Sequence, residues 1–244
     1  MISRDRTTAI AERLVRQIVK DRRSIGLIIV APVIVMSLVG FSLTEHKAML
    51  DRVAPALMAV FVLFFTFVLT GVSFLRERAQ GTLERLMTTT VGRADILVGY
   101  LLGFMIFATV QTIVILFFTI FALRVEYQGN VYEIIAVLML VVVVAVSLGI
   151  FTSTFARNEF QVVQFIPIVF APQVFLSGVI VPVDEMPLVM EAISKILPLT
   201  YAVEGLREIM LQGRGLTDVW PELAVLAAFG VSLLAAAVVT LRRT

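Results

Sequence analysis

The chain has 244 residues, of which 59% are hydrophobic and 16% are charged, and its formal net charge is +2. Its mean hydropathy of +1.00 is far above that of soluble domains, so we predict an integral membrane protein. Cysteine is absent, which excludes disulfides and thiolate metal sites.

Residues 1–24 are strongly basic and hold seven of the twenty lysines and arginines. An apolar stripe runs through them at helical spacing, formed by Ile10, Leu14, Ile18 and Val19. This pattern predicts an interfacial amphipathic helix that lies along an anionic membrane surface. The alternative is a disordered basic leader.

Residues 25–244 form one predicted membrane domain. Six stretches in it contain no Asp, Glu, Lys, Arg or His: 25–43, 54–75, 96–123, 134–155, 162–181 and 223–241. Each is long enough to cross a hydrocarbon core of about 30 Å as a helix, and the alternation typical of barrel strands is missing. We therefore predict an all-α protein with six transmembrane helices.

The distribution of basic residues predicts the orientation of these six helices. An even number of crossings places both termini on one side, and that side carries 14 lysines and arginines against six on the other. The positive-inside rule then makes the termini cytoplasmic. We expect a multi-pass protein of the cell membrane, either the bacterial inner membrane or the plasma membrane.

A dense polar segment, residues 74–95, separates the second and third apolar stretches. An apolar ridge follows helical spacing within it, formed by Ala79, Leu83, Leu86 and Met87. Charged residues take the remaining surface of this predicted helix of about three turns: Arg76, Glu77, Arg78, Glu84 and Arg85. Gly81 lies mid-helix, which indicates close approach of another element. A helix that only rests on lipid headgroups is the alternative to one that binds a partner.

The loop after the fifth stretch predicts an external hairpin of two short amphipathic helices. The first has apolar residues at Met186, Val189, Met190, Ile193, Ile196 and Leu197 and is broken by Pro198. The second has its apolar face at Ala202, Leu206, Ile209 and Met210. Thr200 is a candidate N-cap of this second helix and Gly213 a plausible C-terminal stop.

Helix-breaking and polar residues gather in the fifth stretch, where they could line a moving, substrate-facing helix. The possible translocation path comprises Gln164, Pro167, Pro172, Gln173, Phe175, Ser177 and Gly178. A packed, static kink is the alternative. In the third stretch, Gly99 and Gly103 form a G-x-x-x-G pair, which we interpret as intramolecular packing rather than a dimer seam.

The chemistry of an enzyme is missing from this sequence. There is no H-E-x-x-H, no G-x-S-x-G and no cysteine nucleophile, and none of the lysines Lys20, Lys47 and Lys195 follows a glycine as a P-loop requires. We therefore predict no catalytic residue, no metal site and no cofactor of its own. Because the apolar stretches hold no ionisable group, active transport would need energy from outside the membrane.

Two segments resemble the type 2 ABC transporter permeases, the ABC-2 type. That family typically has R-E-R-x-x-G-T-L-E-x-L followed by an R-x-x-I/L entry to the next span, and the matching residues here are Arg76, Glu77, Arg78, Gly81, Thr82, Leu83, Glu84 and Leu86, with Arg93 to Ile96. Thr90 stands where the family often has proline. Residues 175–187 and 197–207 look like the end of its fifth span and its external hairpin.

The resemblance implies a six-helix permease that works as a dimer, with itself or a paralogue, and with two separate cytoplasmic ATPase subunits that bind the ATP. The implied ATPase-coupling helix contains Arg76, Glu77, Arg78, Gly81, Thr82, Leu83, Glu84 and Arg85. The implied activity is export of a hydrophobic or amphipathic substrate, such as a drug-like molecule, a lipid or a lipid-linked glycan. The alternatives are a non-transporting membrane scaffold and an ion-coupled secondary transporter. No pattern suggests nucleic acid as a partner.

Overall fold

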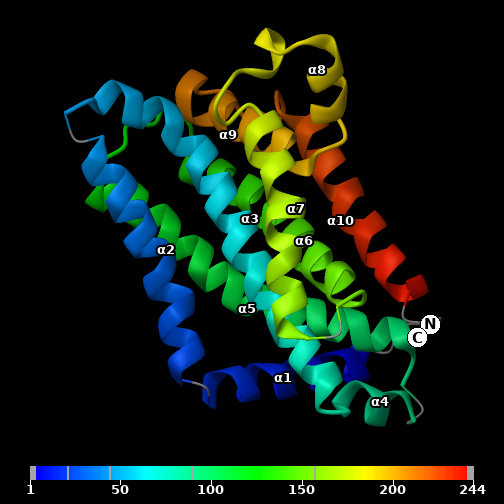
Figure 1. Cartoon of the computed structure of the whole chain (residues 1–244). Coiled ribbons are helices and arrows are strands. Elements are labelled where there is room, and N and C mark those ends of the chain that lie inside the picture. Colours follow the sequence, from blue (N-terminus) through cyan, green and yellow to red (C-terminus); the bar gives the residue numbers. More distant parts are fainter. Residues whose placement is uncertain (1–3, 21, 44, 89–90, 157, 241–244) are drawn as a thin grey trace.

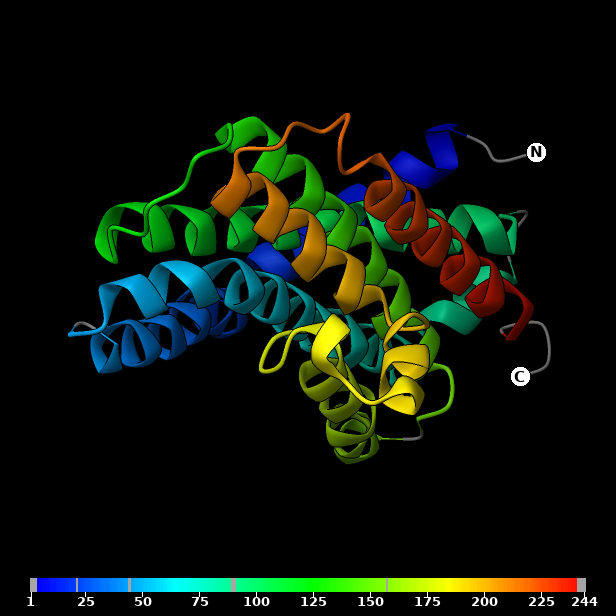
Figure 2. The ribbon, with the colours of Figure 1, turned by 90° about the horizontal axis from the view of Figure 1, so that it is seen from above.

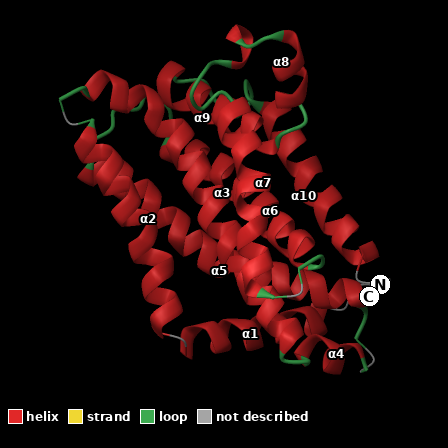
Figure 3. Cartoon of the chain, viewed as in Figure 1, coloured by secondary structure: helices red, strands yellow, loops and turns green. Residues whose placement is uncertain are grey.

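The computed structural model describes residues 4–20, 22–43, 45–88, 91–156 and 158–240. The residues in these ranges form ten α-helices, a π-helix and a 3-10 helix, and no strand occurs among them (Figure 3). The helices are α1 (Arg4–Lys20), α2 (Arg22–Ser42), α3 (Lys47–Ala79), α4 (Thr82–Met87), α5 (Arg93–Phe117), η1 (Phe118–Ala122), α6 (Val131–Ser153), α7 (Glu159–Leu176), η2 (Val183–Glu185), α8 (Leu188–Ser194), α9 (Pro198–Gln212) and α10 (Trp220–Thr240). The predicted all-α class is confirmed.

Five helices are long and apolar enough to cross a membrane. They are α3, the continuous helix Ala94–Ala122 formed by α5 and η1, α6, α7 and α10. The predicted first span falls in α2, where the apolar part found among the described residues, Ile29–Ser42, is shorter. Five of the six predicted spans therefore correspond to a helix of sufficient length.

Two of these helices differ in extent from their predicted spans. The helix α3 reaches well beyond 54–75 at both ends and includes the charged residues that follow it. The helix α7 stops at Leu176 rather than at position 181, because the next residues form a turn in which Gly178 has a φ of 78°. A left-handed residue cannot continue a right-handed helix.

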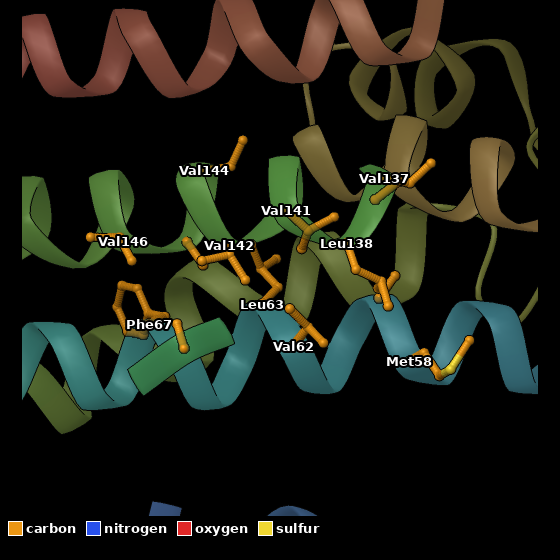
Figure 4. Packing of buried hydrophobic residues seen from close by; sticks show 14 of the residues in the cluster. Met58, Val62, Leu63, Phe67, Val137, Leu138, Val141, Val142, Val144 and Val146 are labelled. Carbon is orange, nitrogen blue, oxygen red and sulfur yellow. The ribbon is translucent and has the colours of Figure 1, made fainter. Parts of the chain in front are cut away.

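The centre of the bundle is the contact between α3 and α6 (Figure 4). Fully buried side chains interlock there, among them Leu63 and Phe67 on α3 and Leu138, Val142 and Val146 on α6, whereas Val137 lies against Gly205 of α9. Val144 points toward α10, so α6 lies between α3 and α10. A Cβ added at Gly149 would lie 2.9 Å from the Cβ of Thr70, so this glycine allows the two helices to approach closely.

The short helices lie at the two ends of the bundle (Figure 1). At one end α1 runs across the ends of the long helices and α4 lies beside it, and we call this the α1/α4 end. At the opposite end α9 crosses the bundle and α8 lies outside it (Figure 2). The start of α1 and the end of α10 are both at the α1/α4 end.

The apolar stripe of α1 packs against protein rather than against lipid alone. Ile10, Leu14 and Ile18 are buried as predicted, whereas Val19 is 53% exposed. Their neighbours are the two glycines of α5. A Cβ at Gly99 would lie 2.8 Å from the Cβ of Ile10, and one at Gly103 would lie 2.7 Å from a methyl group of Leu14. The G-x-x-x-G pair therefore provides the surface against which α1 packs. This confirms that the pair serves packing within the chain.

The predicted hairpin is present, with one correction at the start of its second helix. Pro198 does not only break the first helix but begins α9 at its first position, and Leu197 is the N-cap. Proline suits this position because its missing N–H is not needed there. Thr200 is not a cap: its hydroxyl donates instead to the carbonyl of Ser194, 2.7 Å away. Gly213 ends α9 in the left-handed conformation, as predicted.

The two helices of the hairpin differ in burial. The predicted apolar face of α9 is buried against the bundle: Ala202, Leu206, Ile209 and Met210. In contrast, the large apolar residues of α8 are exposed, with Leu188 84% exposed, and the flanking Met186 and Leu197 are half-buried. Only α9 therefore contributes to the packed core.

We predict that Gly99→Leu displaces α1. The added side chain would overlap Ile10 and the backbone of Thr7, and such overpacking costs about 1–3 kcal/mol. In detergent, the variant should show a lower thermal midpoint and faster tryptic cleavage at the basic residues of α1. Gly26→Leu is the matched control, since a Cβ at Gly26 meets nothing within 4 Å. Equal cleavage rates in the two variants would contradict the packing of α1 described here.

We predict a pH-dependent contribution of Glu204, on α9, to stability. Burial raises the pKa of its carboxyl above the ordinary value, and the nearby carboxylates of Glu222 and Glu208 add to this rise. The folded chain thus binds the proton more tightly than the unfolded chain. The resulting stabilisation is complete below the unfolded pKa and is lost as the pH rises through the folded pKa.

Glu204→Gln should therefore raise the thermal midpoint relative to the unaltered chain, by an amount that grows as the pH rises above the ordinary carboxyl pKa of about 4.3. The measurement is thermal unfolding in detergent over a series of pH values. The exposed Glu185→Gln should leave the pH profile unchanged. Parallel profiles for Glu204→Gln and the unaltered chain would show that this carboxyl has no such role.

Candidate functional site

The last turn of α3 carries a buried carboxylate, that of Glu77, which is 1% exposed. Three donors surround it. Arg13 Nη2 lies 2.7 Å from Oε2, the Tyr100 hydroxyl 2.6 Å from the same oxygen, and Gln17 Nε2 2.5 Å from Oε1. Arg13 also donates to the Tyr100 hydroxyl at 2.7 Å. The carboxylate therefore joins α1, α3 and α5.

The arginines on either side of Glu77 connect α3 to two further helices. Arg76 pairs with Glu159 at the start of α7, with Nε 2.7 Å from Oε1. Arg78 Nη1 donates to the carbonyl oxygens of Ser153 and Thr154, at 2.8 and 3.1 Å, where α6 ends. Carbonyls at a helix C-terminus lack helical partners and carry partial negative charge, which suits a guanidinium. Three consecutive side chains thus tie the end of α3 to four other helices.

The burial of Glu77 and a break in the helix at Gly81 correct the predicted position of the charged residues. We expected them on the free surface of one helix that continues through Gly81. Instead Gly81 has a φ of 69° and separates α3 from the short α4. Arg76, Glu77 and Arg78 belong to the end of α3. On α4, the side chain of Arg85 is exposed.

The remaining predicted coupling residues lie in or next to α4. Thr82 is its first residue and is half-buried. Leu83 and Glu84 are also in α4, but their side chains lie outside the described part of the structure. The structure therefore brings the eight predicted residues together at one end of the bundle, divided between the end of α3 and the segment from Gly81 through α4.

A cavity of about 490 Å³ opens beside the end of α3. Its wall is formed by residues of α1, α2, α3, α5 and α7: Leu14, Gln17, Ile18, Ala31, Phe64, Phe65, Val68, Leu69, Val72, Ser73, Arg76, Glu77, Gln111 and Ile166, together with Gln80 after α3. The part of the wall between Phe64 and Arg76 extends roughly 18 Å along α3. Polar side chains from the end of α3 and from α1 lie at one end, and apolar ones form most of the remainder.

The predicted path residues of α7 do not line this cavity, to which α7 contributes Ile166. Four of them lie on the exposed face of the helix: Gln164, Pro167, Pro172 and Phe175. The other three, Gln173, Ser177 and Gly178, are buried near the opposite end of the bundle. Four of these seven residues are thus exposed and three are buried, and none of the seven lines the cavity.

Several residues of the site were not predicted from the sequence as site residues. Arg13 and Gln17 lie off the apolar stripe of α1, and Tyr100 stands alone in an apolar stretch. A polar group at such a place signals that it has a partner, but does not identify the partner. Gln111, in the middle of the third apolar stretch, gave the same kind of signal.

Comparison with known proteins finds a transporter family and several membrane permeases. Residues 6–211 match the model of the family described as ABC-2 type transporter. ABC transporter G family member 20 of Dictyostelium discoideum is 30% identical over 198 residues, which cover 80% of this chain and 27% of that protein. The probable multidrug ABC transporter permease YbhS of Escherichia coli (strain K12) is 27% identical over 162 residues, which cover 66% of this chain and 43% of that protein.

A third relative is the linearmycin resistance permease protein LnrN of Bacillus subtilis (strain 168). It is 29% identical over 183 residues, which cover 74% of this chain and 47% of that protein. The matched regions therefore span between 27% and 47% of the length of these three relatives.

We predict that Glu77→Leu destabilises the fold far more than Glu159→Leu. Removing the Glu77 carboxylate leaves Arg13, Gln17 and Tyr100 without their acceptor. The free energy of unfolding should fall by about 3 kcal/mol, the lower limit for breaking a buried ion pair, because the half-buried Arg13 regains some hydration. The Arg76–Glu159 pair is about half-exposed on both sides, so its loss should cost less than about 1 kcal/mol. Thermal unfolding of both variants in detergent measures the difference, and equal losses would contradict the central role of Glu77.

Proposed function

The chain belongs to the ABC-2 type transporter family, and we propose that it is the membrane permease subunit of an ATP-driven exporter. The observation that carries this proposal is the connection between α4 and the membrane helices. The helix α4 follows α3 after Gln80 and Gly81, and the end of α3 is bonded to α1, α5, α6 and α7. A protein that binds α4 could therefore move several membrane helices together.

The proposed source of energy is a cytoplasmic ATPase subunit that binds α4. The chain itself lacks the G-x-x-x-x-G-K-S/T motif that holds nucleotide phosphates, so ATP would be bound by that partner. A second permease chain, a copy or a paralogue, would complete the membrane part. We assign no cofactor, metal or catalytic residue to this chain, and the chemical step of ATP hydrolysis belongs to the partner.

We further propose that α2 is the sixth membrane span and that the α1/α4 end faces the cytoplasm of the cell membrane. The helix α2 runs alongside α3 between the two ends of the bundle in both views (Figures 1 and 2). Its 21 residues correspond to roughly 31 Å, enough to cross the hydrocarbon core. The excess of basic residues at the α1/α4 end supports the orientation.

The proposed substrate is a hydrophobic or amphipathic molecule such as a drug-like compound, a lipid or a lipid-linked glycan. The cavity has the volume of a small-molecule site, and its wall combines apolar and aromatic side chains with a few polar ones at one end. Two relatives are named for multidrug transport and for linearmycin resistance, which favours a drug-like substrate and outward movement.

Two rival functions remain distinct from this proposal. A membrane scaffold would bind partners through α4 without moving any substrate. An ion-coupled transporter would use an ion gradient, for which the predicted spans provide no ionisable group. The rivals therefore differ in whether transport occurs and in whether it needs ATP.

We predict that Arg85→Glu abolishes ATP-driven transport without unfolding the permease. Its side chain on α4 is exposed and is not one of the donors to the Glu77 carboxylate, so reversing its charge should act on partner binding. The measurement is ATP-dependent uptake of a fluorescent amphipathic dye by inverted membrane vesicles, together with co-purification of a protein that contains a P-loop. Both should fall at least about tenfold.

Glu185→Lys is the matched control, because it reverses an exposed charge at the opposite end of the bundle. It should leave both readouts unchanged. Uptake driven by an ion gradient without ATP would support the secondary transporter. Normal co-purification with no uptake under any condition would support the scaffold, and either result would overturn the exporter proposal.

A further inference from the structure

We propose that Gln111 determines substrate specificity by hydrogen-bonding to a polar group within the apolar part of the substrate. The proposal rests on the exporter function and adds a requirement to it. The substrate must carry an amide, ester or hydroxyl group on the portion that lies among the membrane helices. A molecule with a polar head and a plain hydrocarbon body would meet this requirement poorly.

The first observation is the state of the Gln111 side chain, which is 0% exposed. Neither its Nε2 nor its Oε1 has a hydrogen-bond partner in the described structure. Gln111 lies roughly 25 Å along the helix from Ala94, the first residue of its apolar helix, so it is deep among the spans. A carboxamide at such a depth normally hydrogen-bonds to a neighbouring helix.

The second observation is the position of Gln111 in the cavity wall. Apolar side chains, including those of Phe64, Leu69 and Ile166, form much of the same wall and offer no acceptor or donor. The polar end of the cavity is made by Arg76, Gln80 and their neighbours. A bound molecule can therefore supply the missing partner of Gln111 once the neighbouring side chains that cover its buried carboxamide move aside.

The cavity wall predicts the form of the substrate. A polar head would lie beside Arg76, Glu77 and Gln80, and the body would lie along the apolar wall of α3. A hydrogen-bonding group on that body would pair with Gln111. A site with a buried amide discriminates strongly against analogues that leave the amide unpaired, because the cost of its desolvation is then not recovered.

Thr112, the next residue on α5, shows why the argument is specific to Gln111. Its hydroxyl is also buried without a partner among the described residues, but it is not in the cavity wall. A threonine hydroxyl on a helix can rotate to bond the carbonyl four residues earlier. A glutamine carboxamide has two N–H groups and an oxygen with two lone pairs, which no single backbone carbonyl can satisfy.

The test measures binding to the full chain in lipid nanodiscs. The probes are two single-chain phosphocholine amphiphiles with the same chain length and fluorophore, one with a mid-chain amide and one with only methylenes. Fluorescence anisotropy, corrected for partitioning into empty nanodiscs, gives both affinities. The unaltered chain should bind the amide probe about tenfold more tightly, the effect of one buried hydrogen bond.

Gln111→Met keeps the length of the side chain but removes its polar atoms, and it should reduce the difference between the probes to less than about twofold. Gln111→Leu should do the same and replaces the methionine variant if that variant is not monodisperse. Thr112→Val is the matched control and should keep the full preference. A chain that binds neither probe, shows no preference, or keeps the preference after either Gln111 substitution would overturn the proposal.

The same variants separate this inference from the exporter function. If ATP-dependent dye uptake persists while the probe preference does not depend on Gln111, the specificity proposal fails and the exporter proposal stands. If the preference depends on Gln111 but uptake never requires ATP, the cavity has the predicted selectivity and the exporter proposal fails.

Discussion

A carboxylate can remain charged among apolar helices only if donors surround it, and this constraint fixes how the α1/α4 end of the bundle is assembled. Glu77 receives hydrogen bonds from Arg13, Gln17 and Tyr100, which come from two other helices. Because each donor must reach the same carboxylate, α1 and α5 have little freedom to shift relative to α3. The amphipathic helix α1 is thereby part of the folded bundle.

Small residues and charged residues act together at this end. Gly99 and Gly103 on α5 leave room for Ile10 and Leu14 of α1, so the apolar contact is close enough for Arg13 to reach Glu77. Arg78 binds the final carbonyls of α6, and Arg76 binds Glu159 of α7. The charged motif that marks the family in the sequence therefore serves largely to join α3 to its neighbours, and α4 is the part of that region that can offer its surface to a partner.

The cavity is a direct result of this arrangement. Since α1 is held across the end of the bundle, its residues Leu14, Gln17 and Ile18 close one side of a space whose other walls belong to α2, α3, α5 and α7. One end of the wall is charged and most of the remainder is apolar, which suits the amphipathic substrate proposed above. The proposed coupling residues and the cavity wall share Arg76 and Glu77, so movement of the end of α3 would change both.

Much of the architecture is determined by local sequence. Charge-free stretches of sufficient length must be helical in a membrane, which places the long helices. Helical spacing also identifies the buried faces of α1 and α9, and the family motif is visible in order from Arg76 to Leu86. These features depend on residues close together in the chain, and periodicity captures them.

Only the tertiary structure decided which polar residues are buried and what they face. The sequence does not show that Glu77 is enclosed while Arg85 is exposed, because that difference depends on donors 64 and 23 positions away. The break at Gly81 depends on a left-handed backbone that the neighbouring helix propensities do not reveal. The cavity joins residues of five helices, and α7 contributes Ile166 rather than its prolines and glutamines. Helical periodicity gives the face of each helix, whereas the neighbour of that face is set by contacts distant in sequence.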